Sequence, residues 1–273
     1  MERELSLLKK ELAGSPHVEF QPAFHTIGMG PESAYRNMTS VLEAASSPVR
    51  PQAVLLCGFA GAVDPSVNTG DLIVSSRYCR EKTNSIHDDH GLVAGCLDGL
   101  DYPDHFEPDP DLFQAACEAA QGSAHRSTPN LFLNPSLTVS GLIGSSSAKQ
   151  AIWDRYHVSS VNMEDYWAAA AAKKAGVPFV SVRAVLDVAH QGLPDYLSSI
   201  SHPGSGALRS TIMRPWRIPT LLTLASQMSR AQNSLALFGL SFIRRFCSVS
   251  AIDPGDSSAV IPEAITGIPG AGQ

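Results

Sequence analysis

The sequence has no long apolar run, no C-x-x-C pair and no excess of positive charge. The longest apolar stretch near its end, Leu235–Ile243, is too short to span a bilayer. The charged start "MERELSLLKKEL" lacks the apolar core of a signal peptide. A net charge of −6 argues against duplex nucleic-acid binding, which needs concentrated positive charge. We therefore expect a soluble, cytoplasmic protein without a nucleic-acid partner.

Several familiar catalytic patterns are also missing. The five cysteines are scattered and odd in number, which favours reduced thiols over disulfides or a structural zinc. The histidines of the acidic segment 84–111 lack the spacing of a metal set, and solvation of a long loop explains them better. No G-x-S-x-G motif is present. "IGMGPESA" supplies Gly28 and Gly30, but Ser33 takes the place of the third glycine of a dinucleotide fingerprint. We expect no metal and no cofactor.

What is present is an alternation of strand-like and helix-like segments. Hydrophobic content of 44% is sufficient for a sizeable core. The patterns predict a helix near residue 1, strands over 18–30, 51–63, 70–79, 131–144 and 177–187, and helices over 31–45, 111–120 and 163–176. Such alternation indicates an α/β domain with a mixed or mostly parallel sheet. We expect one domain over 1–246.

The C-terminal part carries an apolar stripe at helical spacing that predicts a helix over about 219–243. Its members are Leu221, Leu224, Ala225, Met228, Ala231 and Leu235. The helix either packs on the core, which is the better-supported interpretation, or lies against a membrane with Arg244 and Arg245 at its end. The Ser/Gly/Pro-rich segment 247–273 predicts a disordered tail.

The segment "VPFVSVRAVLD" (177–187) predicts a strand buried on both faces, because its apolar residues are largely β-branched. Arg183 and Asp187 interrupt it, and a buried charge is costly unless it is paired or used. Asp187 either caps the next turn or belongs to a site at the carboxyl end of the strand. A shielded Asp187 would have a raised pKa and could act as a general acid. Arg183 is either a structural partner or a contact for an anion.

Two further segments hold candidate binding residues. In "VNMEDYW", Glu164 lies where a helix begins, so it either caps that helix or accepts hydrogen bonds from a ligand diol. Met163 beside it is more often a core residue than a ligand contact. In "CGFAGAV", Gly58, Ala60 and Gly61 follow a buried strand, and their small size lets the backbone approach a flat ligand.

In sequence order, "CGFAGAVDPSVNTGDLIVSS", "TVSGLIG" and "VNMEDYWAAAAAKKAGVPFVSVRAVLDVA" resemble the nucleoside phosphorylase and nucleosidase superfamily. That superfamily includes the methylthioadenosine/S-adenosylhomocysteine nucleosidases. The resemblance covers most of residues 1–200, and its most specific part is the M-E…R-x-x-x-D combination. It implies a three-layer α/β/α fold around a mixed sheet that curls into a partial barrel, in a homo-oligomer that binds a purine nucleoside.

The resemblance also implies roles for individual residues. Glu164 corresponds to the carboxylate that binds the ribose 2′- and 3′-hydroxyls, and Met163 to the residue packed against the ribose. Asp187 corresponds to the acid that protonates purine N7, and Arg183 would hold the acidic site in place. The remaining contacts implied are Ala60 and Gly61 along the nucleoside and Leu142 or Ile143 near the base.

Three positions depart from the family pattern. At the start, "MEREL" matches only the end of the family's G-A-M-E-x-E turn, so Glu4 falls on the carboxylate that positions the attacking water and the first strand is expected to be missing. Asn162 replaces an acidic residue common before the Met-Glu pair. Leu186 replaces a small hydroxyl residue, which removes one hydrogen bond that would orient Asp187.

The segments "GMGPESA", "GFAGAVDPSVNTGD" and "RPWRIPTLLTLASQMSRAQNSLALF" most resemble the branch that releases adenine from adenosylhopane in hopanoid synthesis. The nucleophile is left open between water and phosphate, because the anion-binding first loop is the part without a match. Glu4 favours water. The alternative function is a non-catalytic nucleoside-binding protein of the same fold, which the expected loss of the first strand and Leu186 would favour.

Overall fold

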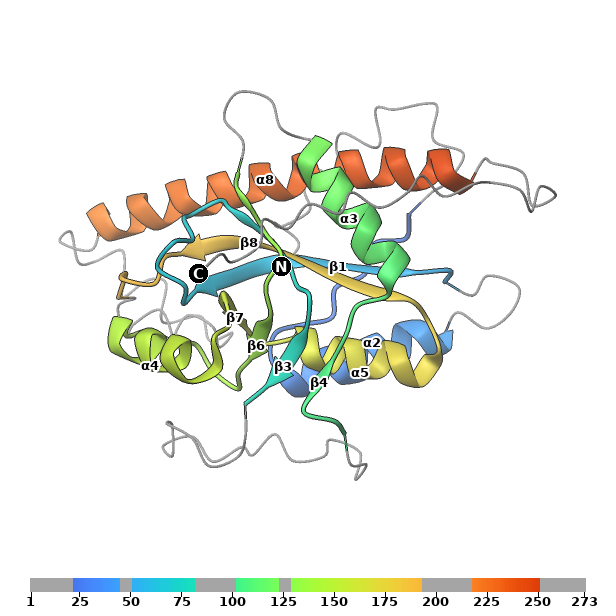
Figure 1. Cartoon of the computed structure of the whole chain (residues 1–273), viewed down its shortest axis with the longest axis horizontal. Coiled ribbons are helices and arrows are strands. Elements are labelled where there is room, and N and C mark those ends of the chain that lie inside the picture. The colour runs from blue at the N-terminus through green and yellow to red at the C-terminus, as the bar shows by residue number, and fades with distance from the viewer. Residues whose placement is uncertain (1–21, 45–50, 82–101, 123–128, 193–217, 251–273) are drawn as a thin grey trace, which may run out of the picture.

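The computed structural model describes residues 22–44, 51–81, 102–122, 129–192 and 218–250. These residues form a mixed eight-stranded sheet in the order β4-β3-β6-β7-β1-β8-β2-β5, with helices on both faces (Figure 1). The strands are β1 (Val54–Ala62), β2 (Leu72–Val74), β3 (Tyr78–Arg80), β4 (His105–Phe106), β5 (Leu131–Phe132), β6 (Ser136–Thr138), β7 (Ser160–Asn162) and β8 (Phe179–Asp187). The helices are α2 (Pro31–Ala44), α3 (Pro110–Gly122), α4 (Ser146–Tyr156), α5 (Asp165–Ala175) and α8 (Ile218–Ser250). The predicted α/β/α fold with a mixed, curled sheet is confirmed.

The centre of the sheet is the parallel pair β1 and β8, the longest of these strands. Every residue of β8 except Leu186 is buried, which confirms the predicted strand covered on both faces. The register of the pair shifts between Ala60 and Gly61, so that Gly61 lies opposite Asp187. Gly61 also pairs with Val161 of the antiparallel β7. Such a bulge increases the local twist, and it lies where the sheet passes from β8 across β1 to β7.

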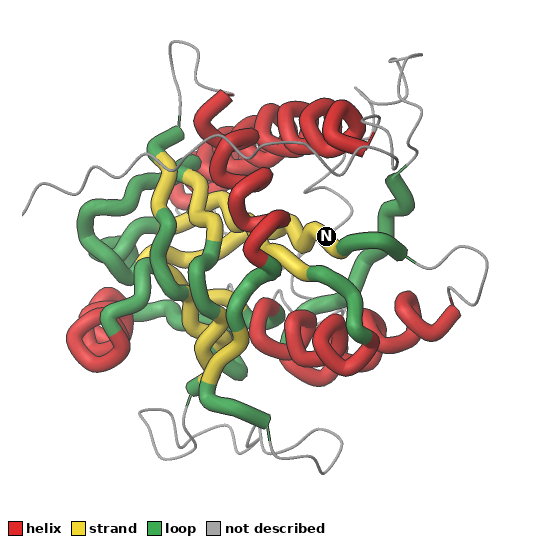
Figure 2. Tube along the Cα trace, turned by 45° about the vertical axis from the view of Figure 1, so that its right-hand side comes forward, coloured by secondary structure: helices red, strands yellow, loops and turns green. Residues whose placement is uncertain are grey.

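The helices form two outer layers (Figure 2). On one face, α2 and α5 pack together through a cluster that includes the consecutive buried alanines of α5, 168–172. On the other face, α3 and α8 cover β2 and β8. Helix α4 packs separately, over the ends of β6 and β7. The sheet core is therefore closed on both sides, and the strand ends carry the polar groups described below.

Local sequence explains where α2 begins and where α5 ends. Pro31 opens α2, because its fixed φ and missing N–H suit a first helical turn. Gly176 ends α5 in the left-handed conformation with φ 65°, and its N–H donates to the carbonyls of Ala172 and Lys173. Both helices match the predictions.

Other predicted elements are corrected by the structure. The expected single strand over 70–79 is two strands: β2 pairs with β8, while β3 pairs with β6 on the far side of the sheet. Residues 131–144 likewise divide into β5 and β6. Residues 22–28, expected in a strand, pair with none of the described strands. Within the expected long loop 84–111, residues 105–106 form β4 on β3, because that edge of the sheet offers unpaired backbone groups.

Helix α8 is longer than the predicted 219–243 and continues through residues 247–250, where a tail was expected. Its apolar side packs on α3 and β8 with Ala231, Leu235, Phe238 and Phe242, so the core-packing interpretation holds there. Arg245 forms an ion pair with Glu118 of α3. No helix in the described ranges is long and apolar enough to cross a bilayer. Residues 1–21 and 251–273, with Glu4, the expected N-terminal helix and most of the expected tail, lie outside the described residues.

Candidate active site

Glu164 and Asp187 are two buried carboxylates near the two strands that flank β1 in the sheet. Asp187 is the last residue of β8 and Glu164 follows β7, and both strands pair with the same residue of β1. Gly61 lies opposite Asp187 of β8 on one side and Val161 of β7 on the other. Glu164 follows β7 by two residues. The exposed fractions of Glu164 and Asp187 are only 9% and 5%. Their strands thus place on either side of β1 two acids that are 23 residues apart in the sequence.

Glu164 does not cap the helix that it precedes. It occupies the N-cap position of α5, yet its side chain makes no capping hydrogen bond. Its Oε1 accepts a hydrogen bond from the Gly30 N–H at 3.2 Å, and its Oε2 lies 3.1 Å from Nη2 of Arg183. The capping interpretation is therefore wrong for this side chain, and its carboxylate is directed toward the turn before α2.

Asn162 performs the capping instead. Its Oδ1 accepts hydrogen bonds from the N–H groups of Glu164 at 3.1 Å and Asp165 at 2.8 Å. The hydroxyl of Thr138 on β6 donates to the same oxygen at 3.0 Å. Helix α5 is thereby joined to the ends of β6 and β7, and this junction determines where Glu164 lies.

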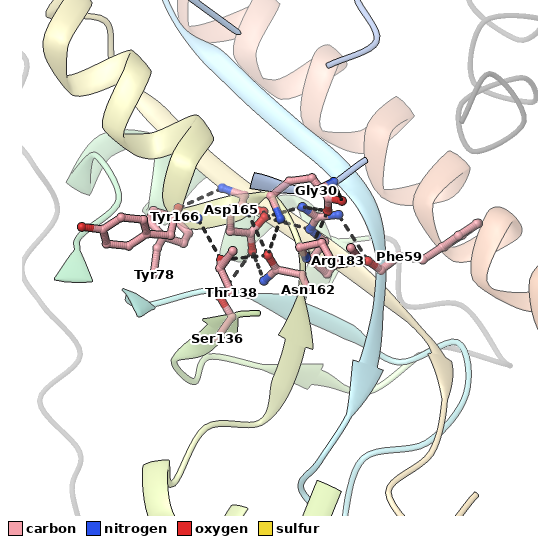
Figure 3. Close-up of polar contacts among 12 residues, drawn as sticks. Gly30, Phe59, Tyr78, Ser136, Thr138, Asn162, Asp165, Tyr166 and Arg183 are labelled. Carbon is pink, nitrogen blue, oxygen red and sulfur yellow. Dashed lines mark hydrogen bonds and ion pairs between the residues drawn. The ribbon is translucent and has the colours of Figure 1, made fainter. Parts of the chain in front are cut away.

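Arg183 points from β8 into a buried polar cluster (Figure 3). Its Nε and Nη2 donate to Oδ1 of Asp165 at 2.9 and 2.5 Å, and its Nη1 donates to the carbonyl of Phe59 at 3.2 Å. Asp165 is fully buried and also accepts hydrogen bonds from Ser181 and Asn162, each at 2.8 Å. Arg183 therefore has two carboxylate partners within the protein, Asp165 and Glu164, which favours the interpretation of it as a structural partner.

Asp187 has a different cation beside it. Lys149 of α4 forms an ion pair with Oδ2 of Asp187, and neither side chain has appreciable solvent contact. Burial raises the pKa of Asp187 above its ordinary value, while the charge of Lys149 and its hydrogen bond act in the opposite direction. The predicted rise in this pKa is thus present, and its largest cause is desolvation.

Sequence reasoning missed Lys149 and Asp165. Helix α4 was not predicted, although Ser145 caps it by accepting from the Ala148 N–H and could have signalled its start. Asp165 follows the Met-Glu pair directly, and the first turn of a helix is a common place for an acidic residue. Nothing local distinguishes it from an ordinary surface acid.

Small residues allow the backbone to approach these charged groups closely. A Cβ atom on Gly58 would lie 2.2 Å from Nη1 of Arg183, and one on Gly61 would lie 3.2 Å from Oδ2 of Asp187. Gly30, with φ 88°, presents its N–H to Glu164, and a Cβ there would be 3.9 Å from Cε of Met163. Gly61 therefore lies beside Asp187, and Met163 lies beside the Gly30 turn that contacts Glu164.

The other predicted ligand contacts, Ala60, Ile143 and Leu142, differ in how far they are exposed to solvent. Ala60 is buried within β1, opposite Val185. Ile143 is buried in the cluster that includes Val161 and contacts Met163. Leu142 beside it is 47% exposed. Within the described ranges, no group of three or more His, Cys, Asp or Glu side chains is arranged to hold a metal ion.

A family model for the phosphorylase superfamily matches residues 19–202, more than half of the chain. The chain belongs to the phosphorylase superfamily. The resemblance inferred from the M-E…R-x-x-x-D pattern is therefore confirmed at the level of the superfamily. Glu164, Arg183 and Asp187 all lie inside the matched segment.

Solved structures within this fold are similar over nearly the whole chain. Futalosine hydrolase of Helicobacter pylori strain 26695 has a TM-score of 0.61 and 17% identity, over 89% of this chain and 94% of that chain. The methylthioadenosine/S-adenosylhomocysteine nucleosidase of Neisseria meningitidis has a TM-score of 0.60 and 18% identity, over 90% and 96%. That of Colwellia psychrerythraea 34H, in complex with adenine, has 0.61 and 17%, over 90% and 92%. Identities this low show a shared fold.

Proposed function

We propose that this protein cleaves the N-glycosidic bond of a purine nucleoside, with Asp187 as the general acid and Glu164 as the ligand of the ribose hydroxyls. The observation that carries the proposal is the position of the two buried carboxylates on either side of β1. Asp187 lies opposite Gly61 at the carboxyl end of β8, where α/β sheets bind ligands, and Glu164 follows β7, whose Val161 pairs with the other side of Gly61. Membership of the phosphorylase superfamily and the similarity to nucleosidases support the same reaction.

The two carboxyl groups have environments suited to different roles. Burial raises the pKa of Asp187, which favours the protonated form that a general acid needs. As the bond between ribose C1′ and the base breaks, its electrons move to the purine and the Asp187 proton goes to N7. Glu164 is held by Arg183 and Gly30, and a carboxylate has further lone pairs for the 2′- and 3′-hydroxyls.

The oxocarbenium-like sugar is then captured at C1′ by an oxygen nucleophile, water or phosphate. We propose water, positioned by Glu4, although Glu4 lies outside the described residues. Met163 would pack on the ribose, and Ala60 and Gly61 would line the nucleoside. A base contact from Leu142 or Ile143 and homo-oligomerisation remain predictions of the resemblance. Contact of the C-terminal helix with a membrane surface stays the less favoured alternative.

For the 5′ substituent we propose a large apolar group, as in adenosylhopane. Met29 supports it, since this side chain is 49% exposed and lies between two glycines with φ values of 85° and 88°. The next residue, Gly30, donates its N–H to Glu164, so Met29 lies beside the proposed ribose site. An exposed methionine there offers a flexible apolar surface to a substituent at C5′.

The test is adenine release from methylthioadenosine and from adenosylhopane, each with and without phosphate. We expect phosphate-independent release that favours the apolar substrate and falls about 10²–10⁴-fold in Asp187→Asn, the typical contribution of general acid catalysis. The exposed Asp154→Asn on α4 is the matched control. Release only with phosphate would instead indicate a phosphorylase. A folded protein that binds nucleosides without turnover would establish the non-catalytic alternative.

A further inference from the structure

Lys149 lies on the core-facing side of α4, where a helix of this kind normally carries an apolar residue. It is fully buried, as is Ile152 three positions later. Trp153 and Tyr156 continue the same face and pack against a cluster of buried apolar side chains. A lysine in this stripe is costly to bury unless its charge is used or fully paired.

The ammonium group of Lys149 is fully satisfied. It contacts Oδ2 of Asp187 and donates to the carbonyls of Val188 at 2.8 Å and Gln191 at 3.2 Å. A lysine ammonium has three N–H donors, so each has an acceptor. All three acceptors belong to the end of β8 and the turn after it, 38 to 42 residues away in the sequence.

Stability alone is a weak explanation for such a pair. Replacing a buried ion pair by packed apolar residues is often neutral or stabilising, because desolvation of both ions offsets their attraction. The contacts of Lys149 are instead concentrated on one carboxylate and on the backbone that carries it. This geometry suits a group that fixes the orientation of Asp187.

We propose that Lys149 is a positioning residue that holds Oδ2 of Asp187 and leaves Oδ1 to face the purine. The inference rests on the proposed function, since it concerns the acid assigned to N7.

The charge of Lys149 also affects the pKa of Asp187. Burial raises the pKa of Asp187 and Lys149 opposes that rise. Among the described residues that pack around this carboxyl, Gly61 of β1 and Val161 of β7 carry no charge. Arg183 on the same strand pairs with Asp165, and the nearby His190 is exposed. Removing the lysine therefore leaves only a backbone hydrogen bond to oppose desolvation, and the pKa of Asp187 moves higher.

The first experiment compares pH profiles of kcat/KM for the wild type, Lys149→Met, Lys149→Gln and Lys149→Arg, with exposed Lys173→Met as the matched control. The protonated acid is the active form, so activity is lost as pH rises through its pKa. We expect Lys149→Met and Lys149→Gln to lower kcat/KM at neutral pH at least about tenfold, because Asp187 is no longer held in place. The basic limb of their pH profiles should move about 1–3 pH units higher, because the pKa of Asp187 rises. Lys149→Arg should keep the limb nearly in place. A lower rate with an unmoved limb in both neutral variants would overturn the proposal.

A second measurement needs no turnover. The ¹³C signal of the Asp187 carboxyl, assigned by its absence in Asp187→Asn, is titrated in the wild type and in Lys149→Gln, which can still donate to the Val188 and Gln191 carbonyls. A higher midpoint in Lys149→Gln supports the proposal, and equal midpoints overturn it. If no nucleoside is cleaved, the proposed function fails while this titration still tests the coupling of Lys149 to Asp187.

Discussion

At the scale of single residues, the partner of each charged side chain of the site is determined by position in the folded structure and not by closeness in the sequence. Arg183 and Asp187 are four residues apart on one strand, yet Arg183 pairs with Asp165 and Asp187 pairs with Lys149. Residues four apart on a strand are separated by about 13 Å along it, which is too far for a direct ion pair. The site therefore contains two separate charged clusters: Arg183 with Asp165 and Glu164, beside the proposed ribose ligand, and Lys149 with Asp187, at the proposed acid.

Glu164→Gln tests the proposed ribose site. The neutral amide weakens the contact with Arg183 and the hydrogen bonds to the substrate hydroxyls. Since a hydrogen bond to a charged group contributes about 1.5–3 kcal/mol, we expect kcat/KM for adenine release to fall about 10- to 100-fold. Glu32→Gln, whose side chain is 66% exposed on α2, serves as the control. Equal activity of both variants would remove Glu164 from the site.

Gly58→Ala tests the close approach of β1 to Arg183. The new Cβ would lie 2.2 Å from Nη1 and 3.2 Å from Cζ of a guanidinium that Asp165 holds in place. We expect the free energy of unfolding in urea to fall by about 1–3 kcal/mol, as in other overpacked sites. Gly141→Ala is the comparison, because nothing lies within 4 Å of its Cβ position. Similar losses in the two variants would mean that Arg183 can move aside.

At the scale of elements, the start of α5 holds together three residues of the site, Asn162, Glu164 and Asp165. Asn162 ends β7 and caps α5, and its Nδ2 donates to Oδ2 of Asp165 at 2.8 Å. Glu164 lies within this junction, between the cap and the first helical residue. An asparagine can serve here because it is an acceptor for the helix and a donor for the neighbouring carboxylate.

Asn162→Asp should therefore make stability depend on pH. The oxygen that caps α5 is kept, but the donor to Asp165 is replaced by a second carboxylate, which raises the pKa of one of the two acids in the folded state. The destabilisation, about 1–3 kcal/mol, is fully present above that raised pKa and is relieved as pH falls through it. Urea unfolding between pH 8 and pH 5 should show the gap to the wild type narrowing.

Asn162→Ala separates charge from capping in the same measurement. It loses the cap, at a cost of about 0.5–2 kcal/mol, without adding a charge, so its gap to the wild type should stay constant over this pH range. If the Asp variant also kept a constant gap, the two carboxyl groups would not interact as the distances indicate.

At the scale of the whole molecule, α8 joins the C-terminal part of the chain to the sheet and to the turn beside the site. Phe238 is fully buried among residues of α3, β2 and β8. Nearer its start, Gln227 exchanges hydrogen bonds with Gln191 at 2.7 and 3.3 Å, and the Gln191 carbonyl is an acceptor for Lys149. Packing of α8 therefore supports β8 and the turn that follows Asp187.

Phe238→Ala should lower the free energy of unfolding by about 3–5 kcal/mol, because it opens a cavity between α8 and the sheet. Leu237→Ala changes the adjacent residue, which is 52% exposed, and should cost no more than about 0.5 kcal/mol. Urea unfolding followed by far-UV circular dichroism measures both. Equal and small losses would show that α8 does not share the cooperative core.

The described fold was predictable where a segment carries its own signals. Helix α2 has its start residue, Pro31, and α5 its stop residue, Gly176, in the sequence, and β8 has a β-branched run. Strands β2 and β3 were merged because Ser75–Arg77, which separates them, contains no glycine or proline. They are separate strands because β2 pairs with β8 and β3 pairs with β6, and this pairing depends on residues that are distant in the sequence.

The sequence by itself determined the superfamily, the mixed α/β fold and the two candidate acids, since these depend on motifs and periodicities within short segments. The tertiary structure decided what each acid contacts: Glu164 meets Gly30 and Arg183, and Asp187 meets Lys149. Lys149 and Asp187 are 38 residues apart and belong to separate elements. Charged side chains pair by proximity in space, and only the packing of α4 against the ends of the sheet creates that proximity.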